Sequence, residues 1–320
     1  LQNLTDRLGI DAIELGDSLG MAMECWERGI LTGKDTNGIK LNWGNVDSII
    51  ELTKLTSYRK GFGQILAEGV KGAADIIGKG APNYAMHAKG LGMTGEEVRT
   101  TQGWALSFAV NVRGGDHLKG SPFGKTRGSI AALILKNIFG SDKVADERSP
   151  ADKGRAVWWQ ENQKALVDSL GMCHFLPRNG LFIAIKEKQF DFLYQLFMAA
   201  TGAKMDFNEF LRCGERIVQT QRAYNARESI TRKDDTLPKR LLTEGAPSEP
   251  GKGLVAQLEH EGMLPEYYTF RGCDQNGLPM RQRLLEAGLE DVANELSVRG
   301  KLSRSKDRIE DFAQVTKYLM

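Results

Sequence analysis

The chain has 320 residues, of which 41% are hydrophobic and 26% charged, with a formal net charge of +2. This is the composition of an ordinary globular protein with room for two domains, and it gives no support for a nucleic acid or an anionic membrane as the main partner. No apolar run approaches the roughly 18 residues that a membrane span needs.

The four cysteines are Cys25, Cys173, Cys213 and Cys273. They form neither a C-x-x-C pair nor the spacing of a disulfide framework, so we expect a reducing compartment and a cytoplasmic protein. The chain opens at Leu1 in the middle of a pattern. We therefore expect a C-terminal fragment or a processed chain, from which part of the functional site is missing.

Helical periodicity dominates the start of the chain. After Asp11, apolar residues recur every three or four positions over 15–30 and stop at glycine-rich turns. Similar stripes run over 46–55 and 65–77. The glycine-rich stretch 78–95 that follows is the predicted domain boundary, which divides the chain into a helical domain 1–90 and a helical domain 91–320.

The second part of the chain also reads as helical. Helices are predicted over 130–139, 155–170, 181–200 and 208–231, followed by a loop at 245–253, a short helix at 280–287 and a charged helix at 305–319. Asp206 and Asn208 are the candidate N-caps of the helix over 208–231. No alternating β pattern of useful length is present, so the predicted fold is all-α, with two multihelical domains.

Two short segments resemble each other and carry the first candidate site. Asp6–Asp11 reads D-R-L-G-I-D, and Asp168–Cys173 reads D-S-L-G-M-C. Each offers a carboxylate followed by a glycine that can end a helix with positive φ. The carboxylate can accept hydrogen bonds from the ring N–H and amino groups of a pterin or purine edge. Two copies suit two similar faces of a pseudo-symmetric ligand, approached by two helical halves from opposite sides, although two unrelated helix ends would give the same pattern.

Cys173 and the segment 113–120 are further candidates for chemistry. Cys173 is either a buried free cysteine or a thiolate ligand whose companions lie elsewhere. The segment 113–120 reads R-G-G-D-H-L-K-G. Its Gly114–Gly115 pair permits close backbone approach to a ligand, His117 suits proton exchange and Lys119 suits a phosphate. A polar surface turn is the commoner use of such a sequence.

Two other segments favour structural interpretations. Glu215, Arg216 and Arg222 lie at near-helical spacing and predict an ion-paired face in a solvated or inter-helix network. The segment 267–272, Y-Y-T-F-R-G, predicts packing followed by a turn.

These motifs, in this order, resemble the C-terminal helical part of the tungsten-containing aldehyde ferredoxin oxidoreductase family. The resemblance runs over nearly the whole chain. It is carried by the segments 6–11, 23–30, 43–45, 61–70, 113–117, 168–173, 214–217, 234–240 and 266–272. Each segment alone is weak, whereas the ordered set is specific.

The resemblance implies a bis-pyranopterin cofactor of tungsten, or of molybdenum, beside a [4Fe–4S] cluster. Asp6 and Asp11 would hold one pterin and Asp168 the other, while Cys173 would be the fourth ligand of the cluster. The cofactor-binding residues that the resemblance implies are Asp6, Gly9, Asp11, Lys119, Asp168, Gly171 and Met172. His117 would lie near the metal and the substrate carbonyl, as the catalytic residue.

The implied reaction converts an aldehyde and water to a carboxylic acid and passes two electrons through the cluster to ferredoxin. In the family, an N-terminal domain with three more cluster cysteines and a glutamate near the metal precedes the part that this chain resembles, so the fragment alone is expected to be inactive. The chain departs from the family's usual pattern at 95–99 and at Cys273. A related tungsten reductase of aromatic acyl-CoA and a metal-free helical scaffold therefore stay open as alternatives, and a homo-oligomer is compatible with the sequence.

Overall fold

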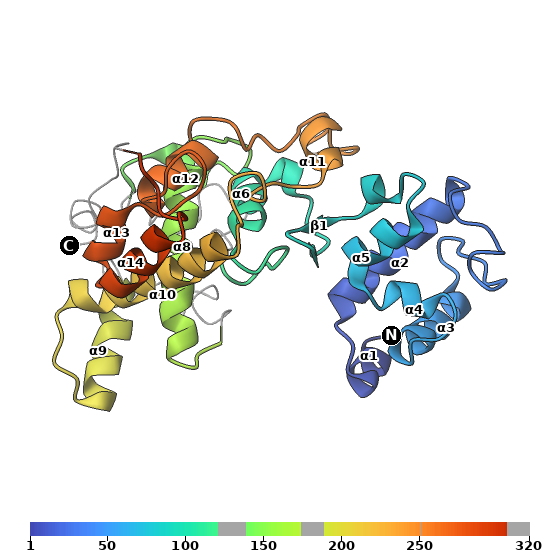
Figure 1. The fold of residues 1–320 in the computed structure, drawn as a ribbon, viewed down its shortest axis with the longest axis horizontal. Coiled ribbons are helices and arrows are strands. Elements are labelled where there is room, and N and C mark those ends of the chain that lie inside the picture. The colour runs from blue at the N-terminus through green and yellow to red at the C-terminus, as the bar shows by residue number, and fades with distance from the viewer. Residues whose placement is uncertain (121–138, 174–188, 250, 306–320) are drawn as a thin grey trace.

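The computed structural model describes residues 1–120, 139–173, 189–249 and 251–305 (Figure 1). Most of these residues are helical, which confirms the predicted all-α class. The helices are α1 (Gln2–Leu8), α2 (Ala12–Glu27), α3 (Val46–Ser57), α4 (Gly63–Leu66), α5 (Gly69–Ile77), α6 (Gln102–Val110), α8 (Lys153–Ser169), α9 (Gln189–Thr201), α10 (Phe207–Arg227), α11 (Lys239–Thr243), α12 (Leu264–Arg271), α13 (Arg281–Glu286) and α14 (Glu290–Val298).

Short 3-10 turns and one small hairpin complete the described part of the chain. The turns are η1 (Ala81–Tyr84), η2 (Val98–Thr100) and η3 (Asp142–Ala145). The hairpin pairs β1 (His87–Ala88) with β2 (Leu91–Gly92) in antiparallel register, so that His87 faces Gly92 and Ala88 faces Leu91. Of the helices predicted over 130–139, 181–200 and 305–319, the residues 130–138, 181–188 and 306–319 lie outside the described part of the chain.

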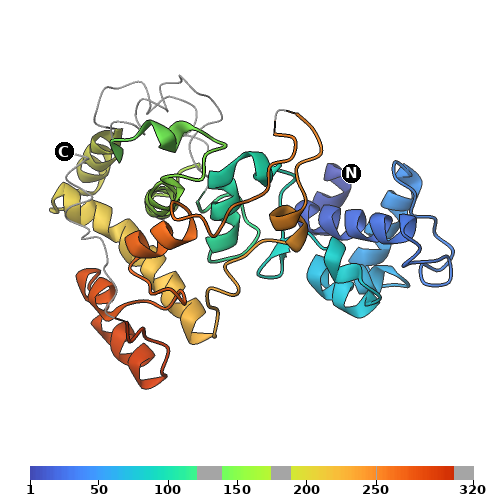
Figure 2. The same ribbon diagram turned by 90° about the horizontal axis from the view of Figure 1, so that it is seen from above.

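The elements form two lobes with the hairpin between them (Figures 1 and 2). The first lobe contains α1 to α5, and its apolar core is formed by residues from 15 to 85. The second lobe contains the elements from η2 onward and has a separate core formed by residues from 93 to 273. The two cores support a division near residue 90, which stays a prediction.

The sequence accounts for where several helices begin. The Asp11 side chain accepts hydrogen bonds from the amides of Ile13 and Glu14, so it caps α2. Asp206 caps α10 in the same way, as predicted, by accepting from the amide of Glu209. The other predicted cap, Asn208, lies inside that helix.

Helix α8 is the centre of the second lobe, where it packs against α10 and α12 (Figure 1). Two glycines allow these helices to approach closely: a Cβ atom on Gly154 would collide with the backbone of Tyr267, and one on Gly214 would collide with the backbone of Asn162. Helix α8 is buried on all sides and is unusually polar there, with Gln160, Glu161, Asn162, Gln163 and Lys164 all less than 5% exposed. Such a helix needs charged partners on its neighbours.

Arg271 of α12 supplies one set of these partners. Its side chain is fully buried and contacts Glu161 at 2.7 Å and Glu215 of α10 at 2.9 Å. The same guanidinium donates to the Asn162 side chain at 2.8 Å. The pKa of Glu161 is raised, because the effect of burial outweighs the opposing effect of the Arg271 charge. The predicted ion-paired segment of α10 is therefore an inter-helix network in the interior.

A second buried cluster adjoins the first. Asp235 lies 2.8 Å from Arg222 of α10 and 2.8 Å from Lys89 of the hairpin turn. Burial acts to raise the pKa of Asp235, but the two cations outweigh it and lower that pKa. The Tyr267 ring lies 5.5 Å from the Arg222 guanidinium and 5.7 Å from that of Arg271, which places the clusters side by side. Three cations thus balance three carboxylates.

The two lobes also meet through α11. Arg240 of this helix binds both carboxylate oxygens of Glu24 in α2, at 3.0 and 2.6 Å. Tyr84 supports the contact, because the guanidinium of Arg240 lies 5.4 Å and that of Arg28 lies 4.5 Å from its ring. Among the described residues, every helix is too short or too polar to cross a bilayer.

Candidate functional site

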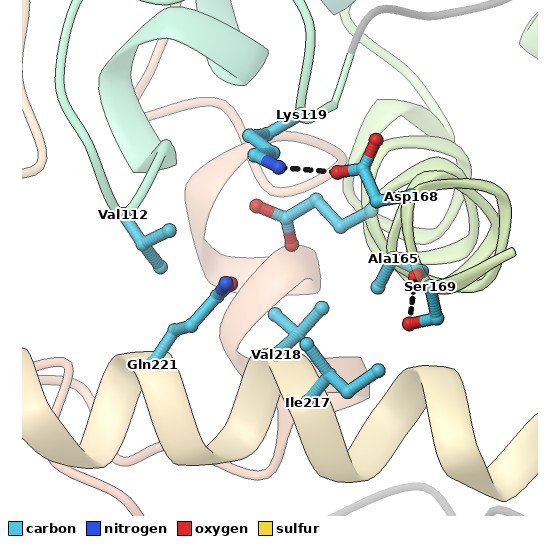
Figure 3. A pocket seen from close by; sticks show the side chains of 9 residues that line it. Val112, Lys119, Ala165, Asp168, Ser169, Ile217, Val218 and Gln221 are labelled. Atoms are coloured by element: carbon cyan, nitrogen blue, oxygen red, sulfur yellow. Dashed lines mark hydrogen bonds and ion pairs between the residues drawn. The ribbon is translucent and has the colours of Figure 1, made fainter. Parts of the chain in front are cut away.

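The structure brings together two predicted site residues that lie far apart in the sequence. Lys119 and Asp168 form an ion pair at the C-terminal end of α8 (Figure 3). A cavity of about 110 Å³ opens beside the pair. It is lined by Val112, Lys119, Glu161, Ala165, Asp168, Ser169, Ile217, Val218 and Gln221. The cavity thus lies between α8, α10 and the segment that follows α6.

The two copies of the sequence motif have the same backbone geometry. Gly9 and Gly171 both end their helices with a φ of 66°. In the first copy the Gly9 amide donates to the carbonyl of Asp6 at 3.3 Å, and in the second the Gly171 amide donates to that of Asp168 at 3.0 Å. Ile10 and Met172 likewise donate to the carbonyl five residues earlier, at 3.0 and 3.1 Å. Both are Schellman ends, which only a residue at ease with positive φ allows.

The carboxylates of the two copies differ in what they contact. Asp6 is exposed on α1 and accepts from the side chain of Gln2 at 2.8 Å. Asp168 is exposed as well, but it pairs with Lys119. Asp11 is a helix cap, with one oxygen accepting from two amides at 2.8 and 2.9 Å. Asp6, Asp11 and Asp168 are all exposed to solvent, and their predicted contacts with the pterins stay predictions.

The glycine pair before His117 has a different role from the expected one. Cβ atoms on Gly114 and Gly115 would collide with the backbone of the hairpin, at Ala88 and at Leu91 and Gly92. The amide of Gly115 also donates to the carbonyl of Ala88 at 3.1 Å. The interpretation that these glycines admit a ligand was wrong, because the space beside them is filled by β1 and β2.

The turn that follows carries His117 and Lys119. Asp116 shapes it: one carboxylate oxygen accepts from the amide of Leu118 at 2.8 Å, and the other pairs with Arg113. The His117 side chain is 26% exposed, and its Nδ1 lies 3.9 Å from the Asp116 carboxylate. The imidazole is thus partly accessible and lies near a carboxylate, two residues from the lysine that reaches the cavity.

Several of these side chains have the chemistry that the cofactors implied by the resemblance need. Asp6 and Asp168 are exposed acceptors at matched turns and Lys119 is a cation, so these residues fit the polar edges of two pterins. Cys173 is exposed, while the Met172 side chain packs partly against the core. Within the described ranges, no three His, Cys, Asp or Glu side chains come together as a metal site. The described residues therefore fit the pterins and supply at most one ligand to a cluster.

Sequence reasoning missed several residues of this region. Glu161 and Gln221 line the cavity, and Glu14 and Asp17 of α2 meet the hairpin from the other lobe. Glu161 and Gln221 each lie on a helix that was predicted, but nothing in a helical pattern shows which residues of two helices face a common cavity. The spacing of Asp11, Glu14 and Asp17 along one face of α2 was visible in the sequence and marks a cluster of negative charge.

Asp17 gives a prediction on stability. Burial, with the nearby charges of Glu14 and Asp11, raises the pKa of Asp17 from 3.8 to about 7. The folded state then binds more protons than the unfolded state between these values, so the stability contributed at this site falls as the pH rises from 4 to 7 and is constant above. We expect Asp17→Asn to unfold at higher denaturant concentration than the wild type at pH 8, with little difference at pH 4.

The measurement is urea unfolding of the 320-residue chain at several pH values across this window. Asp47→Asn, at an exposed position in the first turn of α3, controls for the loss of one surface carboxylate. An unchanged pH profile in Asp17→Asn would contradict the burial of an acid at this position.

Comparison with known proteins identifies the class to which this fold and site belong. The family model described as aldehyde ferredoxin oxidoreductase, domains 2 and 3, matches residues 1–289. The chain therefore belongs to the aldehyde ferredoxin oxidoreductase family, as its motifs predicted.

Several relatives and one solved structure are similar over most of the chain. The tungsten-containing aldehyde ferredoxin oxidoreductase of Thermococcus kodakarensis is 32% identical over 289 residues, which cover 89% of this chain and 44% of that protein. The enzyme of the same name from Pyrococcus abyssi is 32% identical over 90% of this chain and 45% of that protein. An aliphatic sulfonate oxidoreductase, WOR-like subunit, of Pyrococcus furiosus is 31% identical over 92% of this chain and 43% of that protein.

The active-site complex BamBC of benzoyl coenzyme A reductase, solved with 1,5-dienoyl-CoA, has a TM-score of 0.70. The match covers 92% of this chain and 46% of that one at 23% identity, and so shows a shared fold. The chain thus spans less than half the length of the relatives that it matches.

Proposed function

We propose that this chain holds one side of a bis-pterin tungsten (or molybdenum) cofactor in an enzyme that oxidises aldehydes. The whole enzyme would convert an aldehyde and water to a carboxylic acid, two protons and two electrons, and the electrons would leave through a [4Fe–4S] cluster to ferredoxin. The observation that carries the proposal is the meeting of Lys119 and Asp168 at a cavity, because both residues were predicted to bind the same cofactor.

The residues of the chain have separate tasks in this proposal. Asp6 and Asp168 each accept hydrogen bonds from the N–H groups of one pterin, and the Schellman turns after them fix the direction of these carboxylates. Lys119, which pairs with Asp168, would supply a cation beside the same pterin. When bound, the metal–pterin group supplies Lewis acidity and accepts two electrons. His117 moves a proton at its imidazole, and Cys173 contributes one thiolate to the cluster.

The paired motif gives the test of this proposal. In the native holoenzyme, Asp6→Ala and Asp168→Ala should each retain less tungsten or molybdenum per protein, because each leaves N–H groups of a pterin without an acceptor. The measurement is elemental analysis of the purified variants. Asp75→Ala, at an exposed position on α5, is the control. If both variants contain as much metal as the control, the proposal is wrong for these aspartates, and the two turns are simple helix ends.

The substrate is decided by a separate assay. Because a sulfonate oxidoreductase is nearly as similar to this chain as the aldehyde oxidoreductases, an aliphatic sulfonate is the second candidate substrate. Aldehydes, aliphatic sulfonates and an aromatic acyl-CoA should be compared with a ferredoxin-type mediator. Aldehyde-dependent electron transfer is the expected result. A native protein that contains no tungsten, molybdenum or iron would instead be a helical scaffold.

A further inference from the structure

We propose that Glu14 is a positioning residue, which acts through the hairpin β1–β2 to set the relative position of the two cofactor-binding regions. The inference rests on the proposed function, since it assumes that the first motif and the turn of His117 and Lys119 grip one cofactor. Glu14 lies three residues after Asp11, in the first turn of α2, and so belongs to the same rigid segment as the first motif.

The carboxylate of Glu14 joins its own helix, α2, to α5 of the first lobe and to β2 of the hairpin. One oxygen accepts from the amide of Val70, at the start of α5, and the other from the amide of Gly92 in β2, both at 2.6 Å. Bonds from two amides to a charged acceptor are short and directional. Cβ atoms on Gly69 or Gly92 would lie 2.7 or 2.8 Å from these oxygens, so the carboxylate fits a space that only glycines leave open.

The opposite side of the hairpin is fixed to the second lobe. The carbonyl of Ala88 accepts from the amide of Gly115, and the bare backbone of this glycine lies against Leu91 and Gly92. At the hairpin turn, Lys89 enters the second lobe, where it pairs with Asp235 at 2.8 Å and is 6% exposed. The hairpin is therefore held from both sides by backbone and buried charge.

These contacts form one continuous path between the two cofactor-binding regions. It runs from Asp11 and Glu14 through Gly92 and Ala88 to Gly115, and from there along the chain to the ion pair of Lys119. Because the strands have only two residues each, they have few bonds of their own with which to keep their place. A loss at Glu14 should therefore displace the turn of the second lobe, although the described hydrogen bonds of its carboxylate are to Val70 and Gly92.

The first experiment needs no cofactor. In Glu14→Gln the side-chain oxygen can still accept from one backbone amide, but the NH2 group that replaces the second oxygen cannot accept from the other. The weakened contact should make the amides of Val70 and Gly92 exchange hydrogen about tenfold faster. We expect faster exchange at Gly115 as well, measured by mass spectrometry of overlapping peptides. Glu51→Gln, at an exposed position on α3, is the matched control. Faster exchange confined to Val70 and Gly92 would mean a local brace and would overturn the inference.

The second experiment uses the native holoenzyme. Cofactor affinity of Glu14→Gln should weaken by roughly 2- to 30-fold, the range that such couplings span, with an unfolding temperature close to that of Glu51→Gln. Metal retained by Glu14→Gln but lost by Asp6→Ala and Asp168→Ala would overturn this inference alone. Metal retained by all three variants would overturn the proposed function and this inference with it.

Discussion

Replacing Arg271 with methionine is expected to lower the free energy of unfolding by about 3–5 kcal/mol. The reason is the fully buried position of this guanidinium, which contacts the carboxylates of Glu161 and Glu215 and the carbonyl of Trp158. Methionine fills similar space but leaves two buried carboxylates without their cation. Breaking a buried pair on one side destabilises strongly, because the remaining charge stays desolvated.

Two further variants separate charge from volume. Arg299→Met removes an exposed guanidinium, 55% accessible, from its pair with Glu295, so it should change stability by no more than about 1 kcal/mol. Arg271→Lys keeps the charge but not the planar fork that reaches both carboxylates, so an intermediate loss is expected. Urea unfolding of the three variants gives these values.

The pH dependence of Arg271→Met provides a second check. Without the guanidinium, the folded-state pKa of Glu161, already raised by burial, rises further above its unfolded value. The folded state then binds more protons, so the difference from the wild type should shrink as the pH falls. A stability loss that is small, or the same at every pH, would contradict a buried charge network at the centre of the second lobe.

The sequence predicted helices at the places of α2, α3, α5, α8, α9, α10 and α13, but not those of α11, α12 and α14. Asp11 and Asp206 are caps that the residue type alone reveals, and Gly9 and Gly171 end their helices as expected. Helix α6 (Gln102–Val110) was missed because all of its residues are buried, which leaves no amphipathic stripe to detect. The hairpin was missed because strands of two residues have no periodicity.

The candidate site was predictable only in part. The repeated turn around Gly9 and Gly171 could be seen in the sequence, because an aspartate and a helix-ending glycine are local features. The pairing of Lys119 with Asp168 follows from the packing of α8 and is not a local feature. The role of Gly115 also depends on packing that the sequence does not reveal. A glycine that leaves room for a ligand and one that leaves room for a neighbouring strand look alike in a sequence.

Changing His117 to alanine in the native holoenzyme should lower the turnover number by roughly 10²- to 10⁴-fold, with metal and cluster content unchanged, because positioned acid–base groups contribute about this much. The structure supports this choice of residue. The imidazole is 26% exposed and lies 3.9 Å from Asp116, while its neighbour Lys119 reaches the cavity beside α8. The glycines before it are anchored to the hairpin, which holds the turn in place without help from the imidazole.

Two other variants make the result for His117 decisive. His117→Gln keeps hydrogen-bonding groups but cannot take up a proton near neutral pH, so it should be as slow as the alanine variant if proton transfer is the role. His260→Ala removes an exposed imidazole from another turn and should leave the rate near normal. Rate, metal content and cluster absorbance should be measured on the same sample. A His117→Ala enzyme that loses stability or cofactor but keeps its rate per bound metal would make this residue a structural part of the turn, and the proton would then be carried by another group.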